Sequence, residues 1–184
     1  MSLVELIAQA DERGLAASGL ACLDRCVPLL GGDDEILRPL WASLGDGACA
    51  GEWGERLEQA RGKLDAAGPG DEAALLAHRM LEAAPAERSA AGVRVWADAC
   101  SVASLQIHRL LDTAADEASS VDSRREGSTE GMSPLVAAEL RRQITVLEVL
   151  AGHGPAGLRR ALEVSVEGRR VLRAVVSRRS RRQR

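Results

Sequence analysis

Cys22 and Cys26 are the residues whose spacing most directly suggests a chemical role in this sequence. Four residues apart on a predicted helix, their sulfur atoms would lie on one face and could share a zinc or iron ion with His78 or His108. Zinc knuckles, however, usually space their cysteines two residues apart, and no second Cys or His pair follows here. A buried cysteine also serves as a small apolar residue. We favour two core thiols and expect no cofactor, with metal binding at this pair as the alternative.

Other patterns of catalytic chemistry are absent from the sequence. His78, His108 and His153 belong to no recognisable nucleophile motif. The Gly31-Gly32 pair lacks the Gly-Lys-Ser that completes a phosphate-binding loop, and the adjacent acids at 33–35 are ordinary at the start of a helix. The sequence therefore predicts a non-catalytic protein, although dispersed residues can still assemble an active site in the fold.

Positive charge is concentrated at the C-terminal end. Residues 169–184 contain eight arginines and no acid, which leaves 16 basic and 27 acidic residues, a net charge of −11, in the rest of the chain. A guanidinium group can form two hydrogen bonds at once with a phosphate or carboxylate. We therefore predict that an anionic partner contacts these arginines, which are Arg169, Arg170, Arg173, Arg178, Arg179, Arg181, Arg182 and Arg184.

Several interpretations of this arginine-rich end remain open. It could contact a nucleic acid, an acidic protein or lipid surface, or the acidic body of the chain itself, or it could simply be a solvated end. No aromatic residue lies among the arginines to stack on bases, and an acidic body would repel phosphate. These two observations weigh against sequence-specific reading of a nucleic acid.

Composition favours helix over sheet. Ala and Leu dominate, Phe and Tyr are absent, and only Trp41, Trp53 and Trp96 supply aromatic rings, whereas strands are rich in β-branched and aromatic residues. Apolar residues recur at helical spacing, and Ser2 with Glu5 forms a capping box. We expect an all-α fold, either a multi-helix bundle or an irregular array of helical hairpins, with about seven helices.

The predicted helices are separated by glycine, proline and capping residues. They cover residues 2–14, 18–30, 33–44, 52–67, 71–84, 85–118, 134–151 and 156–176. The helix over 85–118 is the longest, and we expect it to be the central core element. Residues 162–168 also alternate like a strand, so a terminal β-hairpin is the alternative for the last segment.

The pattern also predicts how the chain is organised. Residues 1–118 form a helical core domain, and 119–133 form a flexible polar loop because they have almost no apolar content. Residues 134–176 form a C-terminal helical hairpin that packs on the core, and 177–184 form a disordered, arginine-rich tail.

Hydropathy and composition narrow the class of protein. No stretch approaches the ~20 apolar residues of a membrane span, and Glu5 stands where a signal peptide carries positive charge, so we expect a cytoplasmic protein with reduced thiols. Lys63 is the only lysine, which together with the Ala and Gly content indicates a high-GC bacterium.

The favoured function is a protein-protein interaction or regulatory protein of adaptor or immunity type. The alternative is a nucleic-acid-associated regulator that uses its arginine tail.

Overall fold

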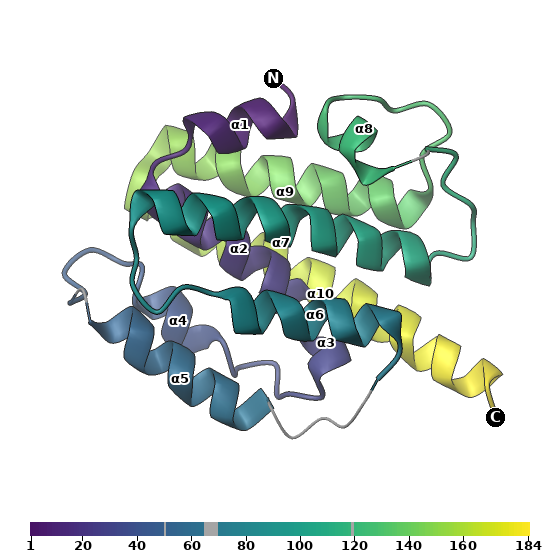
Figure 1. Ribbon diagram of the computed structural model, residues 1–184, viewed down its shortest axis with the longest axis horizontal. Helices are drawn as coiled ribbons and strands as arrows, with labels where there is room; N and C mark the ends of the chain where they lie inside the picture. Colours follow the sequence, from purple (N-terminus) through teal and green to yellow (C-terminus); the bar gives the residue numbers. More distant parts are fainter. Residues whose placement is uncertain (50, 65–69, 119) are drawn as a thin grey trace.

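The fold is described by a computed structural model that covers residues 1–49, 51–64, 70–118 and 120–184. All regular secondary structure within these residues is helical, which confirms the all-α class, and the helices are more numerous than expected (Figure 1). They are α1 (Leu3–Gln9), α2 (Glu12–Arg25), α3 (Val27–Leu30), α4 (Arg38–Ala42), α5 (Glu52–Leu64), α6 (Glu72–Ala83), α7 (Ala90–Leu111), α8 (Val121–Arg125), α9 (Pro134–His153), the 3-10 turn η1 (Gly154–Gly157) and α10 (Leu158–Arg182). None of them is long and apolar enough to cross a membrane.

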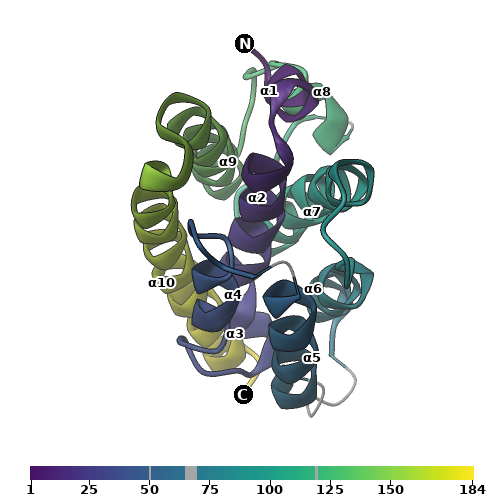
Figure 2. The ribbon, with the colours of Figure 1, turned by 90° about the vertical axis from the view of Figure 1, so that its left-hand side faces the viewer.

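Helix α2, rather than α7, is the central element of the bundle. Every residue of α2 from Gly14 to Arg25 is buried, and its main neighbours are α7, α9 and α10. Figure 2 shows α2 in the middle with the other helices around it. The expectation that 85–118 forms the centre is wrong because α7 keeps an exposed side, on which Val95 is 73% exposed. A helix buried all round has no polar stripe, so periodicity does not single it out.

Small residues let α2 pack closely against its neighbours. Gly19 lies beneath the ring of Trp96 on α7, and an added Cβ there would come 2.6 Å from a ring atom. Trp96 donates a hydrogen bond from its indole N–H to the backbone oxygen of Met80 and meets Trp53 edge to face, with ring centroids 5.8 Å apart. These contacts tie α2, α5, α6 and α7 into one core.

Capping residues determine where several helices begin. The capping box at Ser2 is present as predicted, and Asp71 caps α6 by accepting a hydrogen bond from the backbone N–H of Ala74. Asp11 caps α2 in the same way, so α2 begins earlier than the predicted residue 18 and runs through Gly14 instead of starting beyond it. The Asp11 cap explains why a glycine expected to stop one helix lies inside the next.

The C-terminal segment is one continuous helix, so the alternative of a β-hairpin is wrong. Helix α10 runs on to Arg182, whereas residues 177–184 are predicted to be disordered. Two features explain the longer helix. Val175 and Val176 continue its apolar face, and arginine is a good helix former that is favoured in the last turn by the helix dipole.

The polar segment after α7 also differs from the prediction of a flexible loop. Leaving aside Ser119, which lies outside the described residues, it contains the short helix α8. Val121 is buried, and so are Arg124 and Arg125 despite their charge. The segment has few apolar side chains, so its composition suggested disorder. It is ordered because buried arginines form ion pairs with acidic residues outside it.

We predict that Gly19→Ala and Gly62→Ala change stability in opposite directions. Ala is the better helix former by about 1 kcal/mol, and an added Cβ at Gly62 on α5 meets nothing within 4 Å, so Gly62→Ala should stabilise the fold. At Gly19 the clash with Trp96 should cost about 1–3 kcal/mol, which outweighs the helix gain. Urea denaturation measures both, and equal effects would contradict the close packing of α2 on Trp96.

Candidate functional site

An ion pair between Arg25 and Glu139 lies at the centre of the bundle. The Nε and Nη2 atoms of Arg25 on α2 each donate a 2.7 Å hydrogen bond to one carboxylate oxygen of Glu139 on α9, and both side chains are 0% exposed. Glu139 Oε1 also accepts hydrogen bonds from Ser104 Oγ at 2.7 Å and Gln143 Nε2 at 2.9 Å. Because both side chains are fully enclosed, the pair contributes to the structure of the bundle interior.

The ion pair controls the charge of the groups around it. Burial alone would raise the pKa of Glu139, but the positive charge of Arg25 and the hydrogen bonds from Arg25 and Gln143 lower this pKa to about 2. Burial lowers the pKa of His108, although Glu139, whose Oε2 lies 3.6 Å from His108 Nε2, acts in the opposite direction. The Nδ1 atom of His108 lies 2.6 Å from the backbone oxygen of Ser104. Near neutral pH the pair is ionised and the imidazole is uncharged.

A chain of hydrogen bonds extends this buried cluster to α8. Arg125 donates through Nε to Ser101 Oγ at 3.2 Å, and Ser101 in turn donates to Gln143 Oε1 at 2.6 Å. The adjacent Arg124 pairs with Asp116 at 2.7 Å, where both side chains are 0% exposed, and it also donates to the backbone oxygen of Glu130 at 2.6 Å. These arginine contacts hold the polar segment on α7 and close it around Asp116.

Three of the arginines predicted to contact a partner form ion pairs within the protein, namely Arg169, Arg173 and Arg179. Arg169 on α10 donates to Asp24 Oδ1 at 2.6 Å, and its side chain is 6% exposed. Arg173, one turn further along, pairs with Asp34. Here the arginine-rich end docks on the acidic body, which is one of the alternatives that the sequence left open.

Cys22 and Cys26 lie side by side in the core but do not form part of a larger donor set. In the described part of the chain, no group of three or more His, Cys, Asp or Glu side chains comes together as it would around a metal ion. Burial raises the pKa of Cys22 to about 12 and raises that of Cys26 as well, so both remain thiols. Cys22 accepts a hydrogen bond from Arg25, and Cys26 lies 3.9 Å from Ser104 Oγ.

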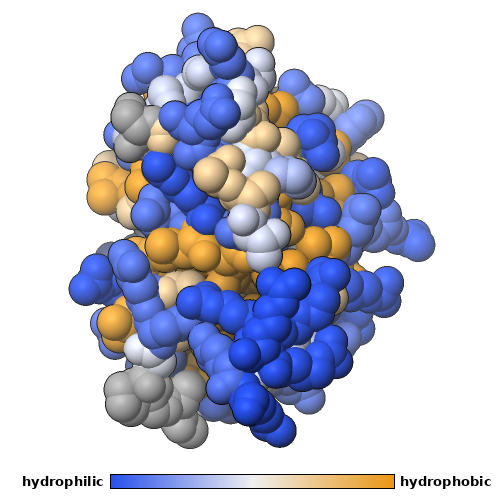
Figure 3. All heavy atoms as spheres, turned by 90° about the vertical axis from the view of Figure 1, so that its right-hand side faces the viewer, coloured by the Kyte–Doolittle hydropathy of each residue, from blue (hydrophilic) through white to orange (hydrophobic). Residues whose placement is uncertain are grey.

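Three of the eight arginines line a cleft at the end of the bundle, which we call the arginine cleft. It has a volume of about 450 Å³ and lies between the end of α7, the start of α9 and the last turns of α10. Figure 3 shows this end of the molecule, where an apolar band is bordered by strongly hydrophilic side chains. The residues lining the cleft are Leu110, Leu111, Asp112, Thr113, Pro134, Leu135, Val175, Arg178, Arg179 and Arg182.

The arginine cleft combines an apolar floor with a basic rim. Leu110 on α7 is 36% exposed, and Leu135 and Val175 are partly buried beside it. Asp112 is the one acid in the lining, and its two oxygens accept hydrogen bonds from the backbone N–H groups of Leu135 and Ala114. Its carboxylate therefore caps the start of α9, and the cleft remains basic on its α10 side.

The eight predicted arginines thus fall into different settings. Arg178, Arg179 and Arg182 line the cleft, and Arg179 also lies 3.2 Å from Asp71. Among the ion pairs of the described residues, none joins Arg178 or Arg182 to a carboxylate. The other three, which are Arg170, Arg181 and Arg184, are exposed away from the cleft lining.

The sequence did not reveal the apolar floor of the cleft. Leu110, Leu135 and Val175 come from three helices that are far apart along the chain, and each belongs to an ordinary amphipathic pattern. The available signal was the persistence of Val175 and Val176 next to the arginines, which marks the end of α10 as amphipathic rather than merely charged.

Comparison with known proteins identifies no relative. No protein-family model matches the chain, and no curated protein or solved structure shows significant similarity to it.

Replacing one partner of the central ion pair should destabilise the fold far more than replacing both. Arg25→Met or Glu139→Gln alone leaves a buried group without its charge partner, at a cost of about 3–5 kcal/mol. In the double variant the amide of residue 139 can still accept hydrogen bonds from Ser104 and Gln143, so we expect a loss well below the sum of the single losses. Free energies of unfolding in urea measure this coupling, and additive losses would show that the two residues act independently.

Acid should weaken the fold in two steps. As pH falls below 6.5, the unfolded chain protonates His108 while the folded protein resists protonation, because the folded pKa is the lower one. Below pH 4.5 the unfolded chain also protonates Glu139, whose folded pKa is about 2, and the stability contributed by this carboxylate is lost between these values. We expect the urea midpoint to fall from pH 7 to pH 5 and to fall further below pH 4.5.

His108→Gln isolates the first of these steps. This variant should show a flatter profile between pH 7 and pH 5 than the wild type. The comparison is needed because burial raises the pKa of Asp24, which affects stability in the opposite direction at acid pH. Identical wild-type and variant profiles above pH 5 would assign the loss to groups other than His108.

Proposed function

We propose that this chain is a non-catalytic protein-interaction module of adaptor or regulatory type, and that its arginine cleft binds an acidic, partly apolar segment of a protein partner. The observation that carries this proposal is the joining of an apolar floor to a row of guanidinium groups in one concave surface. Leu110 and Leu135 provide the floor, and Arg178 and Arg182 provide the rim.

A peptide with alternating apolar and acidic side chains matches both parts of this surface. Its apolar side chains would cover the leucine floor, and its carboxylates would accept paired hydrogen bonds from the guanidinium groups. Arg178 and Arg182 lie one helical turn apart on the same side of α10, so they suit carboxylates spaced along a short segment. Arginines at the edge of an apolar patch are a common feature of protein interfaces.

The same geometry favours a protein over a nucleic acid. The cleft has an aliphatic floor with no aromatic ring on which a base could stack. Residues 1–168 carry a net charge of −11, which would repel a duplex that extends beyond the cleft. A short acidic segment avoids this repulsion because it contacts only the basic end of the protein.

The interior supports a binding role rather than catalysis. The buried titratable groups Glu139 and His108, whose pKa values are both lowered, are fully enclosed by α2, α7 and α9. The surface clefts bring arginines and apolar side chains together, which suits recognition of an anionic surface. Purification of the protein with a stoichiometric cofactor would contradict this part of the proposal.

The proposal predicts that Arg178→Gln with Arg182→Gln weakens partner binding about tenfold to a hundredfold, because two charge-assisted contacts are lost. The matched control is Arg159→Gln with Arg160→Gln, which makes the same change of charge at the opposite end of α10. A partner is first sought by quantitative affinity purification with the wild-type protein, the cleft variant and the control variant. Its dissociation constant is then measured by calorimetry with the purified components.

Photocrosslinking places the partner on the surface. A photoactivatable residue at Leu110 should crosslink to an acidic segment of the partner, and one at Val95, on the other end of α7, should not. Equal crosslinking from both positions, or equal binding by the cleft and control variants, would overturn the proposal. Binding of duplex or single-stranded nucleic acid in a mobility-shift assay, lost in the cleft variant, would assign the cleft to nucleic acid instead.

A further inference from the structure

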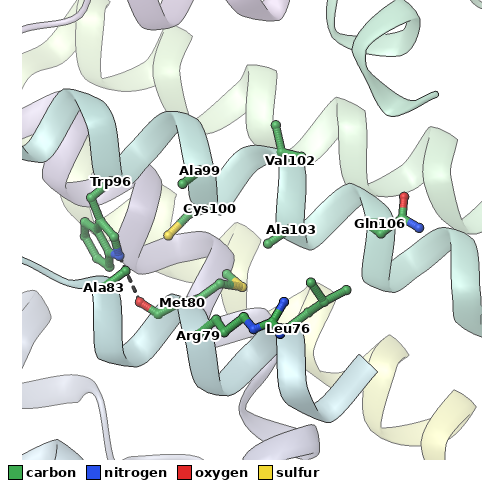
Figure 4. A pocket seen from close by; sticks show the side chains of 10 residues that line it. All are labelled: Leu76, Arg79, Met80, Ala83, Trp96, Ala99, Cys100, Val102, Ala103 and Gln106. Atoms are coloured by element: carbon green, nitrogen blue, oxygen red, sulfur yellow. Dashed lines mark hydrogen bonds between the residues drawn. The ribbon is translucent and has the colours of Figure 1, made fainter. Parts of the chain in front are cut away.

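A second concave surface, which we call the apolar groove, lies between α6 and α7 and is separate from the arginine cleft. It has a volume of about 520 Å³, within the range of roughly 300–1,000 Å³ that is typical of small-molecule sites. Met80 and Cys100 form part of its floor, and no residue that lines it also lines the arginine cleft. Small side chains on α7, such as Ala99 and Ala103, leave the space between the helices unfilled (Figure 4).

The floor of the groove offers no polar group to a ligand. The indole N–H of Trp96 already donates to the backbone oxygen of Met80 at 2.9 Å. Burial raises the pKa of the Cys100 thiol well above its usual value, so this side chain stays uncharged. Such a surface is poorly hydrated and favours an apolar occupant over water.

The polar groups of the groove are confined to one end. In Figure 4, Trp96 and Ala83 lie at one end, while the guanidinium group of Arg79 and the amide of Gln106 lie toward the other, beside Leu76. Arg79 is exposed, and none of the ion pairs among the described residues involves it. The groove therefore has an apolar end and an end with a single positive charge.

From this arrangement we propose that the apolar groove binds a single-chain amphiphilic carboxylate, such as a fatty acid. Its hydrocarbon chain lies along Met80 and Cys100 toward Trp96, and its carboxylate accepts hydrogen bonds from Arg79. A guanidinium group matches a carboxylate with two parallel hydrogen bonds. One cation at one end suits a ligand with one head group, whereas an amphipathic partner helix would place charges along the whole length of the groove.

The experiment titrates the full-length protein with octanoate, decanoate and dodecanoate, each below its critical micelle concentration, and measures binding by calorimetry. Affinity should rise about fourfold for each added methylene while the chain still lies in the groove. The cross-peak of the Trp96 indole N–H in a ¹H–¹⁵N spectrum should shift on binding, because this ring closes the apolar end. The absence of saturable binding at every chain length would overturn the proposal.

Two variants test the two ends of the ligand separately. Arg79→Gln should weaken dodecanoate binding about tenfold and leave dodecanol binding unchanged, while Arg141→Gln, at an exposed position on α9, is the charge-matched control. Ala103→Leu should fill the groove and abolish binding of both compounds, with Ala91→Leu on the same helix as its control.

The remaining outcomes distinguish other occupants. Equal affinities of Ala103→Leu and the wild type would show that the alkanoate binds elsewhere and would overturn the proposal. So would binding of an apolar helical peptide to the groove without any binding of alkanoates. The variant Arg178→Gln with Arg182→Gln should bind dodecanoate like the wild type, so failure of the arginine cleft proposal and failure of this one are distinguishable.

Discussion

The buried pair of Arg25 and Glu139 is the constraint on which the arrangement of the bundle depends. Taking both charges out of water is costly, and the cost is offset only when the two groups meet with good geometry and the remaining lone pairs are satisfied. Two 2.7 Å hydrogen bonds to Arg25, with Ser104 and Gln143 on the same carboxylate, meet this condition. A shift of α2 along α9 by one residue would break this arrangement, so the pair specifies the register of the two helices.

Close packing and buried charge support one another around α2. An added Cβ at Gly168 on α10 would lie 2.4 Å from Cδ of Arg25, so the glycine leaves room for the arginine stem between α2 and α10. Gly19 does the same for the Trp96 ring on α7. Apolar side chains on α2 alone would allow the helix to pack in several positions. The Trp96 ring and the Arg25 side chain each fit only beside a glycine, so they allow one position. The steric fit and the ion pair thus select the same arrangement.

Capping residues in the sequence correctly predicted where several helices begin. Ser2 and Asp71 lie at the starts of helices as expected, because capping depends on near neighbours. The central position of α2 was missed because it depends on partners far along the chain, and the folding of 120–133 was missed because arginine contacts such as Arg124–Asp116, rather than apolar side chains, hold this segment. Glu139 is 114 residues from Arg25, and neither residue belongs to a pattern that marks it as buried.

In the candidate site, too, the sequence predicts some features of helix α10, and others depend on the fold. All arginines of α10 look alike in the sequence, yet Arg169 is enclosed with Asp24 whereas Arg178 lies nine residues later, about half a turn round the helix, and faces the cleft. The position of each arginine around the helix axis therefore decides which guanidinium groups pair with acids of the helical body and which ones face the cleft. The sequence identified the arginines and the segment that carries them. It could not show what each face of α10 contacts, because this depends on the positions of Asp24 on α2 and Leu110 on α7 in the fold. The arginines at the end of this chain thus pair partly with acids of the helical body and partly line the cleft for which we propose a partner.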